Sequence, residues 1–184
     1  MSVKIQILCL IVLSICYGCS TPKFYNEIIS TYPEGKQDDY VMKSSIKPHK
    51  LVLRKLEKSL KNSNHIIYHY VPEATWYSKE FSGIVFDVEN NKYYYFTNSR
   101  NRPRKVQVDT VYKYSNDNYY KFIIENYCQG KIDYLKKLGK ISNHSGYRTS
   151  VVIYDINLKS DTIQRYTFRD FLFLDGKPLI EIEE

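Results

Sequence analysis

The chain has 184 residues, with 27 Lys and Arg against 20 Asp and Glu, and 27 of its residues are Tyr or Phe. Its length predicts one domain, because hydrophobic cores divide only well beyond about 200 residues. A hydrophobic fraction of 43% and an aromatic fraction of 15% exclude an intrinsically disordered protein, and seven Gly and six Pro exclude collagen-like and low-complexity chains.

An apolar segment opens the chain. Lys4 is the only charged residue among the first 18, and a mostly apolar run follows from Ile5 to Cys16. A run of about 12 residues suits the hydrophobic region of an export signal and is too short for the roughly 20 residues of a membrane-spanning helix. We therefore predict that residues 1–18 are a signal peptide.

The end of this segment reads Cys16-Tyr17-Gly18-Cys19 and resembles the lipobox of bacterial lipoproteins. The resemblance rests on Gly18 and Cys19. It implies that the Cys19 thiol receives a diacylglycerol, that the signal is cut before Cys19, and that the new amine is acylated. Two or more acyl chains anchor a protein stably in a bilayer. The alternatives are an ordinary secretory signal cut elsewhere and a buried N-terminal helix.

Cys16 and Tyr17 depart from the strict lipobox, and looser lipoboxes are typical of the Bacteroides group of bacteria. In that group, acidic residues just after the lipidated Cys are associated with export to the cell surface. The sequence Ser20-Thr21-Pro22-Lys23 contains none. The resemblance therefore implies a periplasm-facing protein. Ser20, where Asp would be the alternative, also resembles lipoproteins that are passed to the outer membrane.

The lipoprotein reading also changes the meaning of the four cysteines. Cys9 and Cys16 leave with the signal and Cys19 carries lipid, so Cys128 alone remains. A mature chain with one free thiol has no internal disulfide and no Cys-based zinc site.

Residues 19–47 are predicted to be a lipidated N-terminus and tether, followed by a globular domain over residues 48–184. Within the tether, Phe24 to Tyr32 have helical spacing. Pro48 suits the first turn of the first long helix. That helix has an apolar stripe and a basic opposite face, the stripe being Val52, Leu53, Leu56 and Leu60.

The rest of the chain predicts strands joined by tight turns, because β-branched and aromatic residues alternate between turn-forming residues. A helical region over Asp117–Leu138 interrupts them, with a break at Gly130 and a cap at Gly139. We expect a single α+β domain with about eight mostly antiparallel strands and two main helices, the sheet curling around a helix. The expected strands are His65–Val71, Phe81–Val88, Lys92–Asn98, Lys105–Tyr114, Ser150–Asn157, Thr162–Phe168, Phe171–Leu174 and Pro178–Ile182.

No pattern of catalytic, metal or cofactor residues is present in the sequence, so none is predicted. His65 and His69 are four residues apart, but on a strand that spacing is about 13 Å, too far to share one ion. Cys128 lies near the end of a helix without a nucleophile motif around it. Phosphate-binding loops, dinucleotide fingerprints and Gly-x-Ser-x-Gly elbows are absent.

Two groups of residues are candidates for contacts. Arg100, Arg102, Arg104 and Lys105 form a dense basic cluster around Pro103, expected in a loop, which could contact lipid phosphates or an acidic partner. Nucleic acid is not expected as a partner of an exported protein, although the isoelectric point is about 9.0. The neighbouring rings of Trp76–Tyr77 could stack on sugars, and the alternative is ordinary packing.

The leading hypothesis is a lipid-anchored envelope protein that binds a protein partner or helps an assembly without catalysing a reaction. The alternatives are a periplasmic hydrolase with dispersed site residues and a glycan- or small-ligand-binding module. An enzyme needs polar groups converging in a cleft, a glycan binder needs exposed rings, and a partner protein needs an exposed apolar patch. The sequence leaves the specific ligand and the oligomeric state open.

Overall fold

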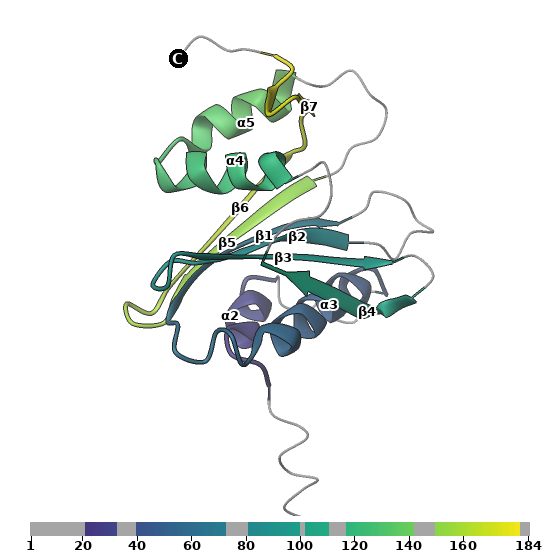
Figure 1. Ribbon diagram of the computed structural model, residues 1–184, viewed down its shortest axis with the longest axis vertical. Coiled ribbons are helices and arrows are strands. Elements are labelled where there is room, and N and C mark those ends of the chain that lie inside the picture. The colour runs from purple at the N-terminus through teal and green to yellow at the C-terminus, as the bar shows by residue number, and fades with distance from the viewer. Residues whose placement is uncertain are drawn as a thin grey trace, which may run out of the picture.

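The computed structural model describes residues 21–32, 40–72, 81–99, 102–110, 117–141 and 150–180. Its centre is a six-stranded antiparallel sheet in the order β4-β3-β2-β1-β5-β6 (Figure 1). The central strand β1 pairs with both β2 and β5 and so joins the two halves of the chain. The strands are β1 His65–Pro72, β2 Phe81–Asp87, β3 Lys92–Ser99, β4 Arg102–Asp109, β5 Ser150–Asn157 and β6 Thr162–Arg169.

Helices cover both faces of this sheet (Figure 1). The helices α2 (Tyr25–Ser30) and α3 (Tyr40–Leu56) lie on one face, and α4 (Asp117–Cys128) and α5 (Ile132–Ile141) lie on the other. We call these the α2–α3 side and the α4–α5 side. Successive residues of a strand point to opposite faces of the sheet. The inner strands carry apolar residues on both faces, so both faces need a cover.

A second, two-stranded sheet ends the described chain. It consists of β7 (Phe173–Leu174) and β8 (Lys177–Pro178), and it packs against α4 on the α4–α5 side. Asp175 and Gly176 form its turn with φ angles of 51° and 81°. Two consecutive positive φ angles are what a tight hairpin turn requires. The Asp175–Gly176 turn was predicted, although the strands are shorter than expected.

The fold is α+β with an antiparallel sheet, as predicted. The arrangement differs in detail, because the eight described strands form sheets of six and two, and four described helices form two layers. The predicted single sheet curling around a helix is therefore wrong. The hairpin turns at Asn91 and Asp161 are confirmed, and both residues have positive φ angles.

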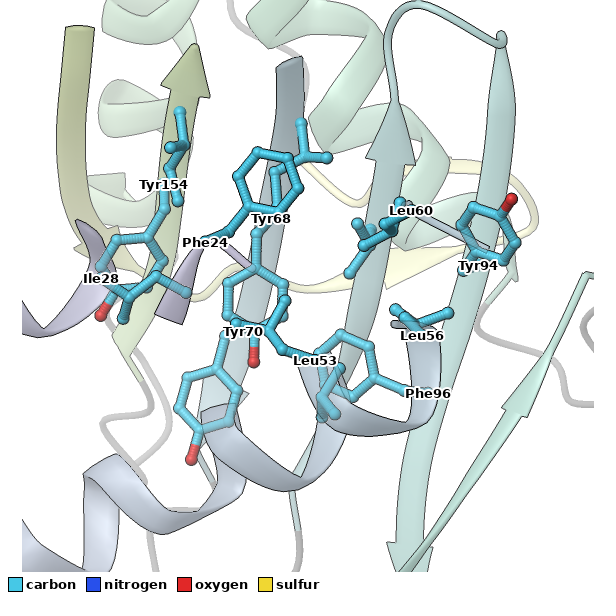
Figure 2. Close-up of a cluster of buried hydrophobic side chains, with 14 of the residues drawn as sticks. Phe24, Ile28, Leu53, Leu56, Leu60, Tyr68, Tyr70, Tyr94, Phe96 and Tyr154 are labelled. Carbon is cyan, nitrogen blue, oxygen red and sulfur yellow. The ribbon is translucent and has the colours of Figure 1, made fainter. Parts of the chain in front are cut away.

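On the α2–α3 side, the core is formed by aliphatic side chains of the helices against aromatic rings of the strands. Leu53, Leu56 and Leu60 are 1% exposed. Figure 2 shows them in one cluster with Tyr68 of β1 and Phe96 of β3. Burying a large apolar side chain contributes roughly 1.5–3 kcal/mol. This face is therefore a substantial source of stability for the fold.

The α4–α5 side has a separate core. Its helices bury four aliphatic side chains against strand residues such as Ile84 and Ile153, all of them 0% exposed. Those helix residues are Ile123, Ile124, Leu135 and Leu138. The sheet therefore divides the interior into two apolar layers.

Two helix boundaries differ from the prediction. The helix α3 begins at Tyr40, so Pro48 lies inside it and not in its first turn. A proline there costs about 3 kcal/mol, which burial of the following apolar stripe offsets. Gly139 lies inside α5 and not at its end. A side chain does not fit there, because the helix passes so close to β6 that a Cβ atom would lie 2.1 Å from the carbonyl oxygen of Arg169. Gly130, with a φ of 76°, does separate α4 from α5.

Candidate functional site

Most of the residues proposed from the sequence have no described side chain. Cys19, Trp76, Tyr77 and Arg100 lie outside the described residues. Arg102, Arg104 and Lys105 lie in the edge strand β4, so the predicted loop is wrong for Arg102 and Arg104, whereas Lys105 lies in a strand, as the expected strand Lys105–Tyr114 had it. An edge strand tolerates Pro103, whose missing N–H needs no partner there. The side chain of Lys105 is described and is exposed.

A larger basic surface lies on α3 and the turn that follows it. Between residues 46 and 62 there are six basic residues and one acidic residue, Glu57, which is a net charge of +5 compared with +7 for the whole chain. We call the six residues the α3 basic surface. They are Lys47, Lys50, Arg54, Lys55, Lys58 and Lys61. A search for consecutive basic residues misses this surface, although helical spacing reveals it.

Five of these six cations are open to solvent. Lys50 is half-buried and its amine lies 5.7 Å from the ring centre of Tyr25, while the other five side chains are exposed. None of the six forms an ion pair with a described residue. Within the described part of the chain, the charge of the α3 basic surface therefore faces solvent and not a carboxylate.

The described chain starts beside this surface. The Lys23 amine donates hydrogen bonds to the carbonyl oxygens of Lys61 and Ser63 and to the side chain of Asn64. Phe24 is 1% exposed and lies in the same core cluster as the leucines of α3 (Figure 2). The start of the described chain is thus fixed to the end of the α3 basic surface.

A buried histidine ties the same layer to the sheet. His49 of α3 is 0% exposed, with Nε2 3.0 Å from the hydroxyl of Tyr32 and Nδ1 2.9 Å from the hydroxyl of Tyr68. Burial, and secondarily the charge of Arg165, lowers the pKa of His49 to about 3. The ring is therefore neutral at ordinary pH, and one nitrogen donates while the other accepts. This arrangement is structural, because both ring nitrogens are already bonded.

The opposite side of the sheet exposes apolar side chains. Leu172, Leu174 and Leu179 are 50%, 60% and 57% exposed, and we call them the leucine surface. The backbone N–H of Leu179 donates to the carbonyl of Leu172 at 2.9 Å. The hairpin directs Phe173 toward α4, where its ring contacts Tyr119, so the neighbouring leucines face outward.

A shallow hollow adjoins the leucine surface. Its volume is about 380 Å³. Leu174, Leu179 and Pro178 line it together with Asp175 and Lys177, which carry opposite charges. Such a lining suits an apolar side chain of a partner with a polar rim. Leu172, Leu174, Leu179 and Ile141 are the exposed large hydrophobic residues of the described chain, and all four come from α5 or the segment around β7 and β8.

One hydrogen-bonded group on the α4–α5 side reaches the surface. His65 Nε2 lies 2.8 Å from one carboxylate oxygen of Asp155, and the Tyr127 hydroxyl donates to the other at 2.7 Å. The side chains of His65 and Asp155 are 27% and 24% exposed. Cys128 follows on α4 and is an exposed residue. Partial burial of its thiol, and secondarily the nearby carboxylates of Asp155 and Glu125, raise its pKa. The thiol is thus held in its protonated, weakly nucleophilic form.

His69 is buried on the same side without such bonds. It is 0% exposed, and neither ring nitrogen has a hydrogen-bond partner on another described residue. Its ring centre lies 5.4 Å from that of Tyr120 and 6.2 Å from that of Tyr119. Burial lowers the pKa of His69 to about 3. Because His65 and His69 both lie on β1, their strand assignment from the sequence is confirmed.

The aromatic residues are used for packing. Every described Tyr and Phe side chain is buried or half-buried. Ring pairs join strand to strand, as for Tyr68 with Phe96, and helix to strand, as for Phe122 with Phe173. Stacking on a sugar needs an open ring face. The described part of the chain therefore lacks an exposed aromatic platform.

Comparison with known protein families, with curated proteins and with solved structures finds no match. No helix among the described residues is long and apolar enough to cross a membrane. In the same part of the chain, no group of three or more His, Cys, Asp or Glu side chains is placed to hold a metal ion. The features that bear on function are therefore the α3 basic surface, the leucine surface and the sequence around Cys19.

Proposed function

We propose that the protein is a lipid-anchored component of a bacterial cell envelope, attached through Cys19 to the outer membrane and facing the periplasm, where it binds a protein partner or helps an assembly. The anchor rests on the apolar run of residues 5–16 followed by Gly18–Cys19. Lys23 and Phe24 are already bonded and buried in the fold. A domain that starts so soon after Cys19 suits attachment close to the bilayer.

The leucine surface is the observation that carries the binding role. Three neighbouring leucines that are at least half exposed lose contact with water when a partner covers them, and such patches are typical of protein interaction sites. They lie on the α4–α5 side, whereas the described chain begins on the α2–α3 side (Figure 1). A protein anchored through Cys19 would present the leucine surface away from its own membrane.

A second candidate function, a periplasmic hydrolase, rests on the group formed by His65, Asp155 and Tyr127. A partly exposed histidine paired with a carboxylate can act as a general base. The raised pKa of Cys128 gives this base no activated thiol nearby. The leucine surface is therefore stronger evidence for partner binding than the group of His65, Asp155 and Tyr127 is for catalysis. Replacing His65 by Gln should abolish any hydrolysis that the purified protein performs.

The anchor is tested by changing Cys19→Ala in cells and separating membranes from soluble protein. The normal chain should lie in the membrane fraction with the mass of a lipidated Cys19 and without residues 1–18. The variant should lack that added mass. A normal chain without lipid on Cys19 would contradict the proposed anchor.

The binding role is tested by placing a photo-crosslinking residue at position 174 or, as a control, at position 58 on the α3 basic surface. Position 174 should give one reproducible adduct with an envelope protein, and position 58 should not give that adduct. The changes Leu172→Ser and Leu179→Ser should weaken the adduct. Absence of any protein adduct at position 174 would count against partner binding.

A further inference from the structure

The α3 basic surface is built as one side of an amphipathic element. Val52, Leu53 and Leu56 are at most 1% exposed and lie against the sheet, while Arg54, Lys55 and Lys58 are exposed. Because the apolar stripe faces the core, the cations project away from the sheet. In Figure 1, α2 and α3 form the outermost layer on this side. The basic residues thus form a broad outward surface.

This surface lies close to the candidate lipid attachment point. Lys23 is bonded to the turn after α3 through the carbonyl oxygens of Lys61 and Ser63. Lys23 is four positions beyond Cys19, and a fully extended chain spans at most about 3.3–3.6 Å per residue, so this stretch covers at most about 14 Å. That reach is comparable with the electrostatic screening length of about 10 Å at 0.1 M salt. The turn after α3, to which Lys23 is bonded, can therefore lie within about one screening length of the bilayer, where its charges interact with an anionic surface.

We propose that the α3 basic surface binds the anionic phospholipid headgroups of the bilayer in which Cys19 is anchored, and so turns the α2–α3 side toward the membrane. Ammonium and guanidinium groups pair with lipid phosphates, and several neighbouring cations act together on an anionic surface. The orientation rests on the proposed anchor at Cys19. The affinity for headgroups is a property of the folded surface itself.

The other side of the sheet supplies a matched control. Lys136, Lys137 and Lys140 of α5 are exposed, like the cations of α3. Lys136 lies 3.1 Å from the carboxylate of Asp133, and α5 lies across the sheet from the first described residues (Figure 1). Reversing three charges on either surface changes the net charge equally. The two changes differ in location and in the Lys136–Asp133 ion pair, which the α5 change removes.

The test uses the chain from Ser20 to Glu184, which contains every described residue of both cores. Its binding is measured to vesicles of phosphatidylcholine alone and of phosphatidylcholine with phosphatidylglycerol. One variant carries Arg54→Glu, Lys55→Glu and Lys58→Glu, and the other carries Lys136→Glu, Lys137→Glu and Lys140→Glu. Urea unfolding of both variants confirms that each is folded.

The unchanged chain should bind the anionic vesicles and not the neutral ones, and the binding should weaken at high salt. The α3 variant should bind at least about tenfold more weakly, and the α5 variant should change by less than about threefold. Equal losses in the two variants, or equal binding to both kinds of vesicle, would overturn the proposal. Because this chain lacks Cys19, such a result would leave the lipid anchor standing, just as a missing lipid on Cys19 would leave the vesicle result standing.

Discussion

The two sides of the central sheet use similar helices for different surfaces. The α2–α3 side presents cations and receives the start of the described chain, and its buried His49 is hydrogen-bonded on both ring nitrogens. The α4–α5 side presents the leucine surface, and its buried His69 is not bonded to another described residue. A sheet covered on both faces can thus keep a charged surface and an apolar surface apart within one small protein.

Lowering the pH should have the largest effect on stability, because each side of the sheet buries one histidine. The pKa of each falls from 6.5 to about 3 on folding. Below about pH 6.5 the unfolded chain binds these protons and the folded chain does not, so stability is lost as the pH falls toward 3. The loss is up to about 1.4 kcal/mol per pH unit for each histidine. Urea unfolding at a series of pH values measures it.

A variant separates the contributions of the two sides. His69→Phe should reduce the slope near pH 5 by about 1.4 kcal/mol per pH unit, because one of the two histidines is gone. An unchanged slope would show that His69 is protonated, or accessible to protons, in the folded protein.

The next largest effect concerns the start of the described chain. Phe24→Ala should lower the free energy of unfolding by about 3–5 kcal/mol, because it empties a fully buried position on the α2–α3 side. On the α4–α5 side, Leu172→Ala should change it by less than about 0.5 kcal/mol, because Leu172 is half exposed. Denaturant unfolding measures both. A small effect of Phe24→Ala would mean that the segment before α3 is a loose tether.

At neutral pH, replacing either histidine by phenylalanine should change stability by a smaller amount, and the two changes should have opposite signs. His49→Phe should cost about 1–3 kcal/mol, because the buried hydroxyl of Tyr68 loses its partner. His69→Phe should be neutral or stabilise by about 1 kcal/mol, because two unbonded polar atoms are removed. The same sign for both variants, in thermal or urea unfolding, would contradict the contrast between the two sides.

The sequence predicted local features well. The turns at Asn91, Asp161 and Asp175–Gly176 follow from residues that tolerate positive φ angles. The six-stranded sheet depends on pairing between β1 and β5, which are far apart in the chain. No local pattern encodes that pairing. Gly139 was misplaced for the same reason, since its closeness to β6 is a long-range contact.

The candidate site was harder to predict. The cluster from Arg100 to Lys105 stood out because its charges are consecutive, whereas the α3 basic surface spreads its charges over helical turns. The apolar stripe of α3 was visible in the sequence. The opposite face of that helix carries more basic residues than the cluster from Arg100 to Lys105. The leucine surface could not be predicted, because Leu172 and Phe173 look alike in sequence and only the packing of β7 against α4 exposes one and covers the other.

The orientation of the lipidated protein on a bilayer tests the central claim most directly. In a chain with Cys128→Ser, a fluorescent label is attached through Lys58→Cys or Leu174→Cys, and the protein is reconstituted into vesicles that carry a quencher at the headgroups. We expect strong quenching at position 58 and weak quenching at position 174. Equal quenching at the two positions, or stronger quenching at position 174, would contradict the assignment of the α2–α3 side to the membrane.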